Sequence, residues 1–375
     1  MRSSAPSTAS ASPTSPRTHI AFMTDAPRVA GSEVWLLDLL PMLQARGLQT
    51  TMFLSREPRL DELVRRFGEA GVAVHRYGAL EELPELTRDF DLRVLQMWYR
   101  HHYSELLPRL RGPRWVVSHD QMEFHYPQPL RFTHREAYPW TKAGPFRQAD
   151  RILTVSEWAG DFVRRQMRLP DVRVLHNGVD AERYRPAHDE AEREALREAH
   201  GFGRFTVLVP GRFAPEKNQM TALLAARAAP HLDFVFTGDM DSPIGNLVQG
   251  VARRGRVTNA RFLGRRWDMP DLYRAADALL QPTLAENQSL VTLEAMASAL
   301  PVVTTPIPAQ AELVQDGVSG LLVKPRPGLL ATALGALAAH PHRARDFGAA
   351  ARAHILSRHT LTHTADRLAE LLREP

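Results

Sequence analysis

Short apolar runs, rich in β-branched residues, alternate with amphipathic stretches along almost the whole chain. In the first half they predict buried strands at 18–25, 49–55, 72–77, 92–98, 115–120, 151–156 and 172–178. In the second half they predict strands at 205–212, 232–239, 260–264, 278–283, 301–306 and 320–325. Strands that alternate with helices predict parallel sheets covered by helices on both faces. We therefore expect an α/β fold.

A polar segment at 182–204, which has no strand pattern, separates the two series of strands. This division predicts two doubly wound, Rossmann-like domains that face each other across a cleft. Ligands of such folds bind beyond the carboxyl ends of the strands, so the function should lie in that cleft. The Ser/Thr/Ala/Pro-rich stretch at 1–17 predicts a disordered tail, and the chain ends in an amphipathic helix.

One helix pattern contains a proline. The segment 32–47 has apolar residues at helical spacing, and Gly47 is a plausible end. Pro41 predicts either a kink or a later start of this helix.

Composition excludes several classes of site without naming a ligand. The 375 residues include no cysteine, which excludes disulfides, thiolate metal centres and cysteine nucleophiles. The net charge of +5 is spread over arginines interleaved with acidic residues, so nothing indicates nucleic acid. The pairs Arg164-Arg165 and Arg265-Arg266 could help at an anionic membrane surface, although a plain surface role is favoured.

The chain carries no pattern of a membrane span or a secretory signal. The longest apolar stretch starts at Gly328 and is shorter than the roughly 18 residues that a bilayer requires. The N-terminus lacks the apolar region of a signal peptide. We expect a cytoplasmic protein, and leave open peripheral contact with the inner face of the membrane.

Two cations bracket a loop between a strand and a helix. Arg212 follows Gly211 at the end of a predicted strand, and Lys217 falls where a helix opens near Glu216. A cation in the first helical turn opposes the macrodipole, whereas a bound phosphate would favour both cations. The alternative is that Glu216 neutralises Lys217 while Arg212 caps a neighbouring carbonyl. This segment alone leaves both interpretations open.

Two glutamates follow a strand of the second series. Glu286 falls in the loop after the strand, Ser289 can cap the next helix, and Glu294 lies one to two turns inside it. Both carboxylates can point to the same rim of the cleft, where they would suit sugar hydroxyls or general acid/base work. The alternative is one solvated glutamate and one on a helix surface.

Taken together, these segments resemble glycosyltransferase family 4, whose members are retaining enzymes with the GT-B fold. The resemblance covers about 172–325 and is carried by four motifs: VLHNGVDAERYRP (174–186), GRFAPEKN (211–218), the long segment from Arg261 to Val303, and ELVQDGVSGLLVKP (312–325). It implies an acceptor-binding N-terminal domain at 18–185 and a nucleotide-sugar-binding C-terminal domain at 186–355. It also implies that the helix at 356–375 packs back towards the N-terminal domain.

The resemblance implies roles for particular residues of the C-terminal domain. Arg212 and Lys217 would bind the diphosphate, Glu294 would hold the ribose hydroxyls, and Glu286 would contact the donor sugar. Further donor contacts are implied for Gly211, Asn287, Gln288, Ser289 and Leu290. Many relatives have glycines where this chain has Asn287, Gln288 and Ser289, which leaves the donor sugar open.

The resemblance is weaker in the first half. Gly31 stands where a pair of glycines usually reaches the phosphates, and His119 matches a histidine near the reacting sugar. Ser156 matches another recurring position, although a helix N-cap explains it equally well.

Two possible metal motifs are set aside. Asp239 and Asp241 form a D-x-D, which here falls where the family has a turn. The histidines at 101, 102, 119 and 125 lack the spacing of a metal-binding helix, and His101 and His102 are expected in a loop near the acceptor or at the surface. We expect no metal and no cofactor.

The implied activity is retaining, metal-independent transfer of a sugar from a nucleoside diphosphate sugar to an acceptor hydroxyl. The acceptor would be a sugar, a lipid-linked sugar or a small molecule, and no nucleic acid is involved. The alternatives are a sugar-nucleotide epimerase, a phosphorylase-like enzyme or a non-catalytic relative. A phosphorylase would need a pyridoxal phosphate lysine, but Lys142 and Lys324 lie outside any matching motif.

Overall fold

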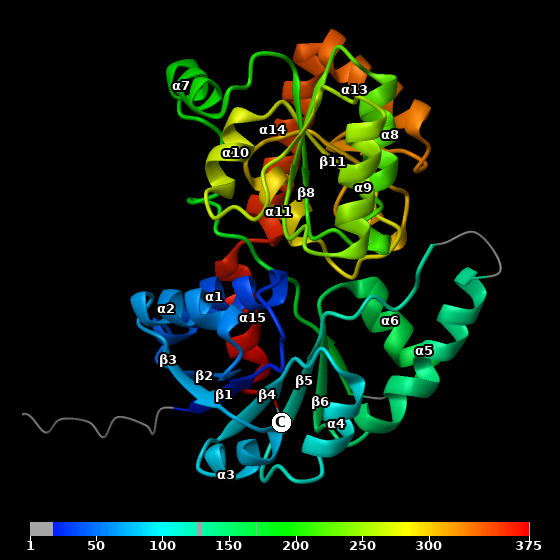
Figure 1. Cartoon of the computed structure of the whole chain (residues 1–375). Helices are drawn as coiled ribbons and strands as arrows, with labels where there is room; N and C mark the ends of the chain where they lie inside the picture. Colours follow the sequence, from blue (N-terminus) through cyan, green and yellow to red (C-terminus); the bar gives the residue numbers. More distant parts are fainter. Residues whose placement is uncertain (1–17, 126–129, 170, 375) are drawn as a thin grey trace, which may run out of the picture.

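The computed structural model describes residues 18–125, 130–169 and 171–374. The tail predicted at 1–17 lies outside the described residues. Two α/β units are stacked one above the other, each with helices around a parallel sheet (Figure 1). The predicted fold class is therefore confirmed.

The lower unit in Figure 1 is built on a sheet of seven parallel strands in the order β3-β2-β1-β4-β5-β6-β7. Each strand overlaps a run predicted from the sequence. The bounds are β1 (His19–Met23), β2 (Gln49–Ser55), β3 (Ala73–Tyr77), β4 (Leu92–Leu95), β5 (Arg114–Ser118), β6 (Arg151–Thr154) and β7 (Val172–Val174).

The upper unit has a sheet of six parallel strands in the order β10-β9-β8-β11-β12-β13. These strands also overlap the predicted runs. The bounds are β8 (Thr206–Pro210), β9 (Asp233–Thr237), β10 (Ala260–Phe262), β11 (Ala278–Gln281), β12 (Val302–Thr304) and β13 (Gly320–Leu322). In both sheets the strand order reverses beside the first strand, and such a switch point opens a crevice at the carboxyl ends of the strands.

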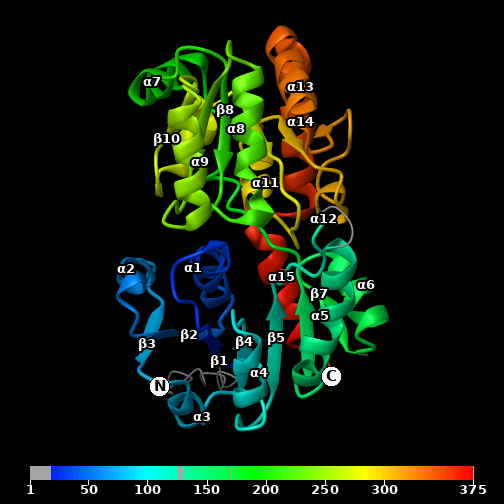
Figure 2. The ribbon, with the colours of Figure 1, turned by 45° about the vertical axis from the view of Figure 1, so that its right-hand side comes forward.

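Helices cover the sheets of both units (Figures 1 and 2). Those of the N-terminal unit are α1 (Gly31–Gln44), α2 (Asp61–Glu69), α3 (Leu83–Leu86), α4 (Arg100–Leu106), α5 (Leu130–Phe146) and α6 (Glu157–Gln166), with 3-10 turns at Pro58–Leu60 and Leu80–Glu82. The C-terminal unit has α7 (Glu190–His200), α8 (Gln219–Ala228), α9 (Pro243–Arg254), α10 (Met269–Ala275), α11 (Leu290–Ala297), α12 (Pro308–Ala311), α13 (Pro327–Ala339) and α14 (Pro341–Arg358), with a 3-10 turn at Pro215–Lys217. Among the described helices, none combines the length and apolar character needed to cross a membrane.

Helix α1 runs through its proline. It begins at Gly31 and continues to Gln44, so the later start predicted from Pro41 is wrong. The amide of Ala45 still donates to the Pro41 carbonyl at 3.0 Å, and Gly47 follows with φ +83°.

The chain crosses between the units twice, and the two crossings pair with each other. After β7, the amide of Val179 donates to the His359 carbonyl at 2.9 Å, and the amide of Leu361 donates back to Val179 at 3.0 Å. The crossings meet so closely that a Cβ on Gly178 would lie 2.4 Å from the Thr360 carbonyl oxygen. These paired segments form a hinge.

The last helix, α15 (Leu361–Leu371), lies on the N-terminal unit although α14 belongs to the C-terminal one. In Figure 1 it descends beside α1. Its apolar face shares one buried core with Leu36 and Leu39 of α1 and contributes Leu361, Ala365, Leu368 and Leu371. Chain segments from both ends of the sequence therefore build the N-terminal unit.

Candidate functional site

A cavity of about 490 Å³ lies between the two units, at the carboxyl ends of both sheets. Eleven site residues predicted from the sequence all line it: Gly31, His119, Gly211, Arg212, Lys217, Glu286, Asn287, Gln288, Ser289, Leu290 and Glu294. The structure thus brings together groups that are up to 263 positions apart in the sequence. Their roles remain predictions.

The cations of the loop after β8 are each paired with a buried carboxylate. Arg212 pairs with Glu216, and Lys217 pairs with Glu286, which comes from the loop after β11. The alternative interpretation, in which Glu216 neutralises Lys217 and Arg212 caps a neighbouring carbonyl, is therefore wrong. The loop forms a 3-10 turn, and Asn218 has φ +55°, so α8 begins only at Gln219 and not near Glu216.

Glu286 is held in a network of buried side chains. The Gln281 amide donates to it at 2.8 Å, and the Gln281 oxygen accepts from the Ser289 hydroxyl at 2.9 Å. Ser289 also caps α11, because its oxygen accepts from the Thr292 amide at 3.3 Å. The network fixes the direction of the Glu286 carboxylate before any ligand binds.

Glu294 is partly buried beside two tyrosines. The Tyr273 hydroxyl donates to it at 2.7 Å, and burial, the largest cause, raises the pKa of Glu294 to about 7. Nearby, Arg183 pairs with Asp38 of α1 at 3.2 Å, and burial raises the pKa of Asp38 to about 6. Because the pKa of Glu294 lies near neutral pH, a ligand that changes the environment of its carboxylate can change its charge.

Sequence reasoning gave no role to Arg183, Tyr184 or Tyr273, although all three line the cleft. Each lies inside or beside a quoted motif, so the signal was present without an assignment. The plain surface role for Arg265 and Arg266 is wrong. Both line the cleft, where Arg265 donates to the Val29 carbonyl of the opposite unit and Arg266 pairs with Asp268.

His119 lines the cleft and has one ring nitrogen without a partner among the described residues. Its Nε2 atom is buried without a hydrogen-bond partner in the described part of the chain, and its ring meets Trp35 edge-on at 5.2 Å. Burial lowers the pKa of His119 to about 4, against the opposing effect of Asp120. The imidazole is therefore neutral near pH 7, as suits a hydrogen bond to a sugar hydroxyl.

Asn287 joins the two units. Its amide nitrogen donates to the carbonyls of Ser118 and Asp120 at 3.1 Å each, and its oxygen accepts from the Ser156 hydroxyl at 2.8 Å. Ser156 also caps α6 through the Ala159 amide, so the N-cap interpretation is confirmed. Asn287 thus connects the loop after β11 to the strand ends of the N-terminal unit.

Replacing Asn287 by alanine should loosen this connection. The variant removes three hydrogen bonds between the units, so we expect a loss of about 2 kcal/mol in the free energy of unfolding. Thermal melting measures the change. Asn246→Ala, at an exposed position on α9, is the matched control and should melt like the wild type. Equal melting temperatures for both variants would contradict the connection.

The two motifs set aside as metal sites have other partners. Asp239 pairs with Arg28 at 3.1 Å, and its second oxygen accepts from the Asp241 amide at 3.0 Å, which makes a turn. Among the described residues, no group of three or more His, Cys, Asp or Glu side chains could hold a metal ion. His101 and His102 lie in helix α4 and not in a loop, and His102 pairs with Asp25.

The cleft carries more positive than negative charge. Its lining includes six basic residues, Arg28, Arg183, Arg212, Lys217, Arg265 and Arg266, and four acidic residues, Asp120, Asp239, Glu286 and Glu294. Such a balance favours an anionic ligand with hydroxyl groups, since the carboxylates can accept hydrogen bonds while the cations meet the negative charge.

Family comparisons cover both units. The family model "Glycosyltransferase Family 4" matches residues 29–183, and "Glycosyl transferases group 1" matches residues 204–340. α-Maltose-1-phosphate synthase of Mycolicibacterium smegmatis is 30% identical over 74% of this chain and 77% of its own length. The chain belongs to glycosyltransferase family 4. The resemblance seen in the motifs is thereby confirmed. The protein is a glycosyltransferase.

Other relatives agree with this assignment. α-D-Kanosaminyltransferase of Streptomyces kanamyceticus is 27% identical to this chain, over 72% of this chain and 73% of the kanosaminyltransferase. HepE of Anabaena, solved in complex with UDP-glucose, has the same fold with a TM-score of 0.82 at 21% identity, over 95% of this chain and 100% of that one. The fold is thus the GT-B arrangement of two Rossmann-like domains.

Proposed function

We propose that this glycosyltransferase moves a hexosyl group from a UDP-sugar to an acceptor hydroxyl, with retention of the anomeric configuration and without a metal ion. The observation that carries the proposal is the convergence of Arg212, Lys217, Glu286 and Glu294 in one cleft. The two cations suit a diphosphate, and the two carboxylates suit the hydroxyls of the sugar and the ribose. The solved complex of HepE with UDP-glucose supports the choice of uridine.

Donor binding would exchange the partners of Lys217. In the ligand-free protein its ammonium group pairs with Glu286. A diphosphate carries more negative charge than one carboxylate and would draw Lys217 to itself, together with Arg212. Glu286 would then accept hydrogen bonds from the hydroxyls of the donor sugar. The pairing thus keeps both side chains ordered until the donor arrives.

The chemical step needs charge stabilisation more than a protein nucleophile. The bond between the anomeric carbon and the β-phosphate oxygen breaks, and the acceptor oxygen bonds to that carbon on the same face. The acceptor proton passes to the departing phosphate oxygen. Lys217 and Arg212 stabilise the negative charge that grows on the diphosphate. The names of α-D-kanosaminyltransferase and α-maltose-1-phosphate synthase specify the α configuration, which supports retention.

Independence from metal is supported by two features of the cleft. The cations Arg212 and Lys217 already supply positive charge where the diphosphate would lie. Asp239, the D-x-D aspartate that lines the cleft, pairs with Arg28 across the domain interface. A metal ion there would have to displace this ion pair.

A thermal-shift panel with UDP, GDP and ADP, each with and without EDTA, tests the proposal. We expect UDP to raise the melting temperature by several degrees at 100 times its dissociation constant, because such binding adds about 2.7 kcal/mol. EDTA should not change the shift. A shift that disappears with EDTA would contradict metal independence, and a larger shift with GDP or ADP would contradict the uridine donor. A second assay with UDP-glucose and a panel of acceptors measures transfer.

A further inference from the structure

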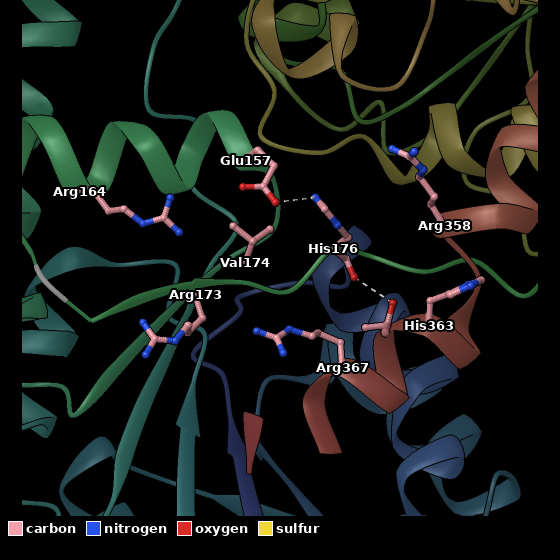
Figure 3. Close-up of a pocket in the computed structure, with 9 residues that line it drawn as sticks. Glu157, Arg164, Arg173, Val174, His176, Arg358, His363 and Arg367 are labelled. Carbon is pink, nitrogen blue, oxygen red and sulfur yellow. Dashed lines mark hydrogen bonds and ion pairs between the residues drawn. The ribbon is translucent and has the colours of Figure 1, made fainter. Parts of the chain in front are cut away.

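A second cavity, of about 420 Å³, lies beside the hinge and is distinct from the cleft. It is lined by four arginines and two histidines but by only one carboxylate in the described part of the chain: Arg164, Arg173, Arg358, Arg367, His176, His363 and Glu157, with Val174 and Thr364 (Figure 3). We propose that this cavity is a binding site for a phosphate group, either inorganic phosphate or a phosphate monoester.

The basic side chains come from both domains. Arg164 lies on α6 and Arg173 on β7 of the N-terminal domain, and Arg367 lies on α15, which packs against that domain. Arg358 is the last residue of α14 in the C-terminal domain. Figure 3 shows them arranged around one hollow, on either side of His176. A phosphate bound here would bridge the two domains.

Arg358 is the lining arginine that an anion would stabilise most. No ion pair or hydrogen bond of its side chain is found among the described residues, whereas Arg164 pairs with Asp161, Arg173 with Asp171, and Arg367 with Glu370. The carboxylates of those pairs do not line the cavity. Arg173 and Arg367 also pair with Glu374. Among the described residues, Arg358 is therefore the lining arginine whose charge no carboxylate meets, and a phosphate could accept hydrogen bonds from it and from the free N–H groups of the paired guanidinium groups.

His176 lies between charges of opposite sign. Burial is the largest cause and lowers its pKa, Glu157 at 4.0 Å raises it, and Arg358 lowers it by a smaller amount. Its carbonyl accepts from the Thr364 hydroxyl at 2.9 Å, which ties the two hinge crossings together.

Neighbouring residues of one crossing face the two cavities. His176 lines the basic hollow. Asn177 lines the cleft, where its backbone amide donates to the Gln288 side chain. A phosphate on His176 and the arginines would hold this segment in the arrangement seen here. We infer that the basic hollow is coupled to the cleft through the hinge.

The site is tested by melting the protein in phosphate, in a hexose 6-phosphate and in chloride at equal ionic strength. We expect either phosphate to raise the melting temperature of the wild type by about 3 °C at saturation. The two phosphate solutions distinguish the free ion from the monoester. Arg358→Ala should lose the shift and can fold, since its side chain has no partner to lose in the part of the chain that is described. Arg367→Ala should reduce the shift.

Two control variants separate the hinge site from the cleft. Lys217→Ala removes a cation of the cleft and should keep the phosphate shift. Arg227→Ala removes an exposed arginine of α8 and should also keep it. A shift that survives in Arg358→Ala and Arg367→Ala, or one that is lost in Lys217→Ala, would overturn the proposal, as would the absence of any shift in the wild type. Because no nucleotide is used, the outcome does not depend on the proposed donor.

Discussion

Replacing Lys217 by alanine is expected to lower kcat by about 10²–10³-fold, because the diphosphate would lose a preorganised positive charge as it departs. Donor affinity should fall as well. The readout is the rate of sugar transfer, with melting temperature as a check on folding. Lys324→Ala is the matched control, because that lysine is exposed and does not line the cleft.

Glu286→Gln examines the partner of the same ion pair. The glutamine keeps the size of the side chain but cannot give Lys217 a counter-charge or accept hydrogen bonds at two charged oxygens. We expect a comparable loss of transfer with little change in melting temperature. If transfer survives in both Lys217→Ala and Glu286→Gln, the assignment of the diphosphate and sugar positions is wrong.

The sequence was sufficient to predict the sheets and the place of the cleft. Buried parallel strands leave continuous apolar runs, so all thirteen strands of the described part of the chain appear in the apolar pattern. Loops after parallel strands meet at one edge, which explains why Gly211 and Glu286 converge although they lie far apart in the chain. The local apolar pattern and the topology of a parallel sheet were therefore enough to predict the strands and the position of the cleft.

The environments inside the cleft could not be predicted. The partner of Lys217 is Glu286 and not Glu216, because a loop 69 positions away supplies the nearer carboxylate. Asn287 reaches carbonyls on β5 and just beyond it, which no local pattern records. The 3-10 turn before α8 depends on a left-handed Asn218, which a helical periodicity does not reveal. Such details follow from tertiary contacts.

Replacing Glu294 by glutamine should change how stability depends on pH. The pKa of Glu294 is about 7 in the folded protein, above its ordinary value of 4.5, because burial disfavours the charged form. Between these values the folded state holds more protons than the unfolded state, so this group lowers the free energy of unfolding as pH rises. The penalty approaches about 3 kcal/mol at pH 8 and is absent at pH 4.

The glutamine variant lacks this penalty, so its free energy of unfolding relative to the wild type should rise by about 3 kcal/mol from pH 4 to pH 8. Denaturant melts at several pH values measure the trend, and Glu198→Gln, at an exposed position of α7, should show none.

With Glu294 in the proposed ribose-binding role, UDP affinity should follow the opposite trend. Ribose hydroxyls would donate to the ionised carboxylate, so UDP would bind the wild type more weakly at pH 6 than at pH 8. Part of this change in affinity comes from the titration of the UDP phosphate itself. Glu294→Gln keeps only that part, so the difference between the two proteins is the part due to Glu294. If Glu294→Gln binds UDP as tightly as the wild type does, Glu294 does not bind the ribose. The unfavourable burial of its carboxylate would then serve another ligand.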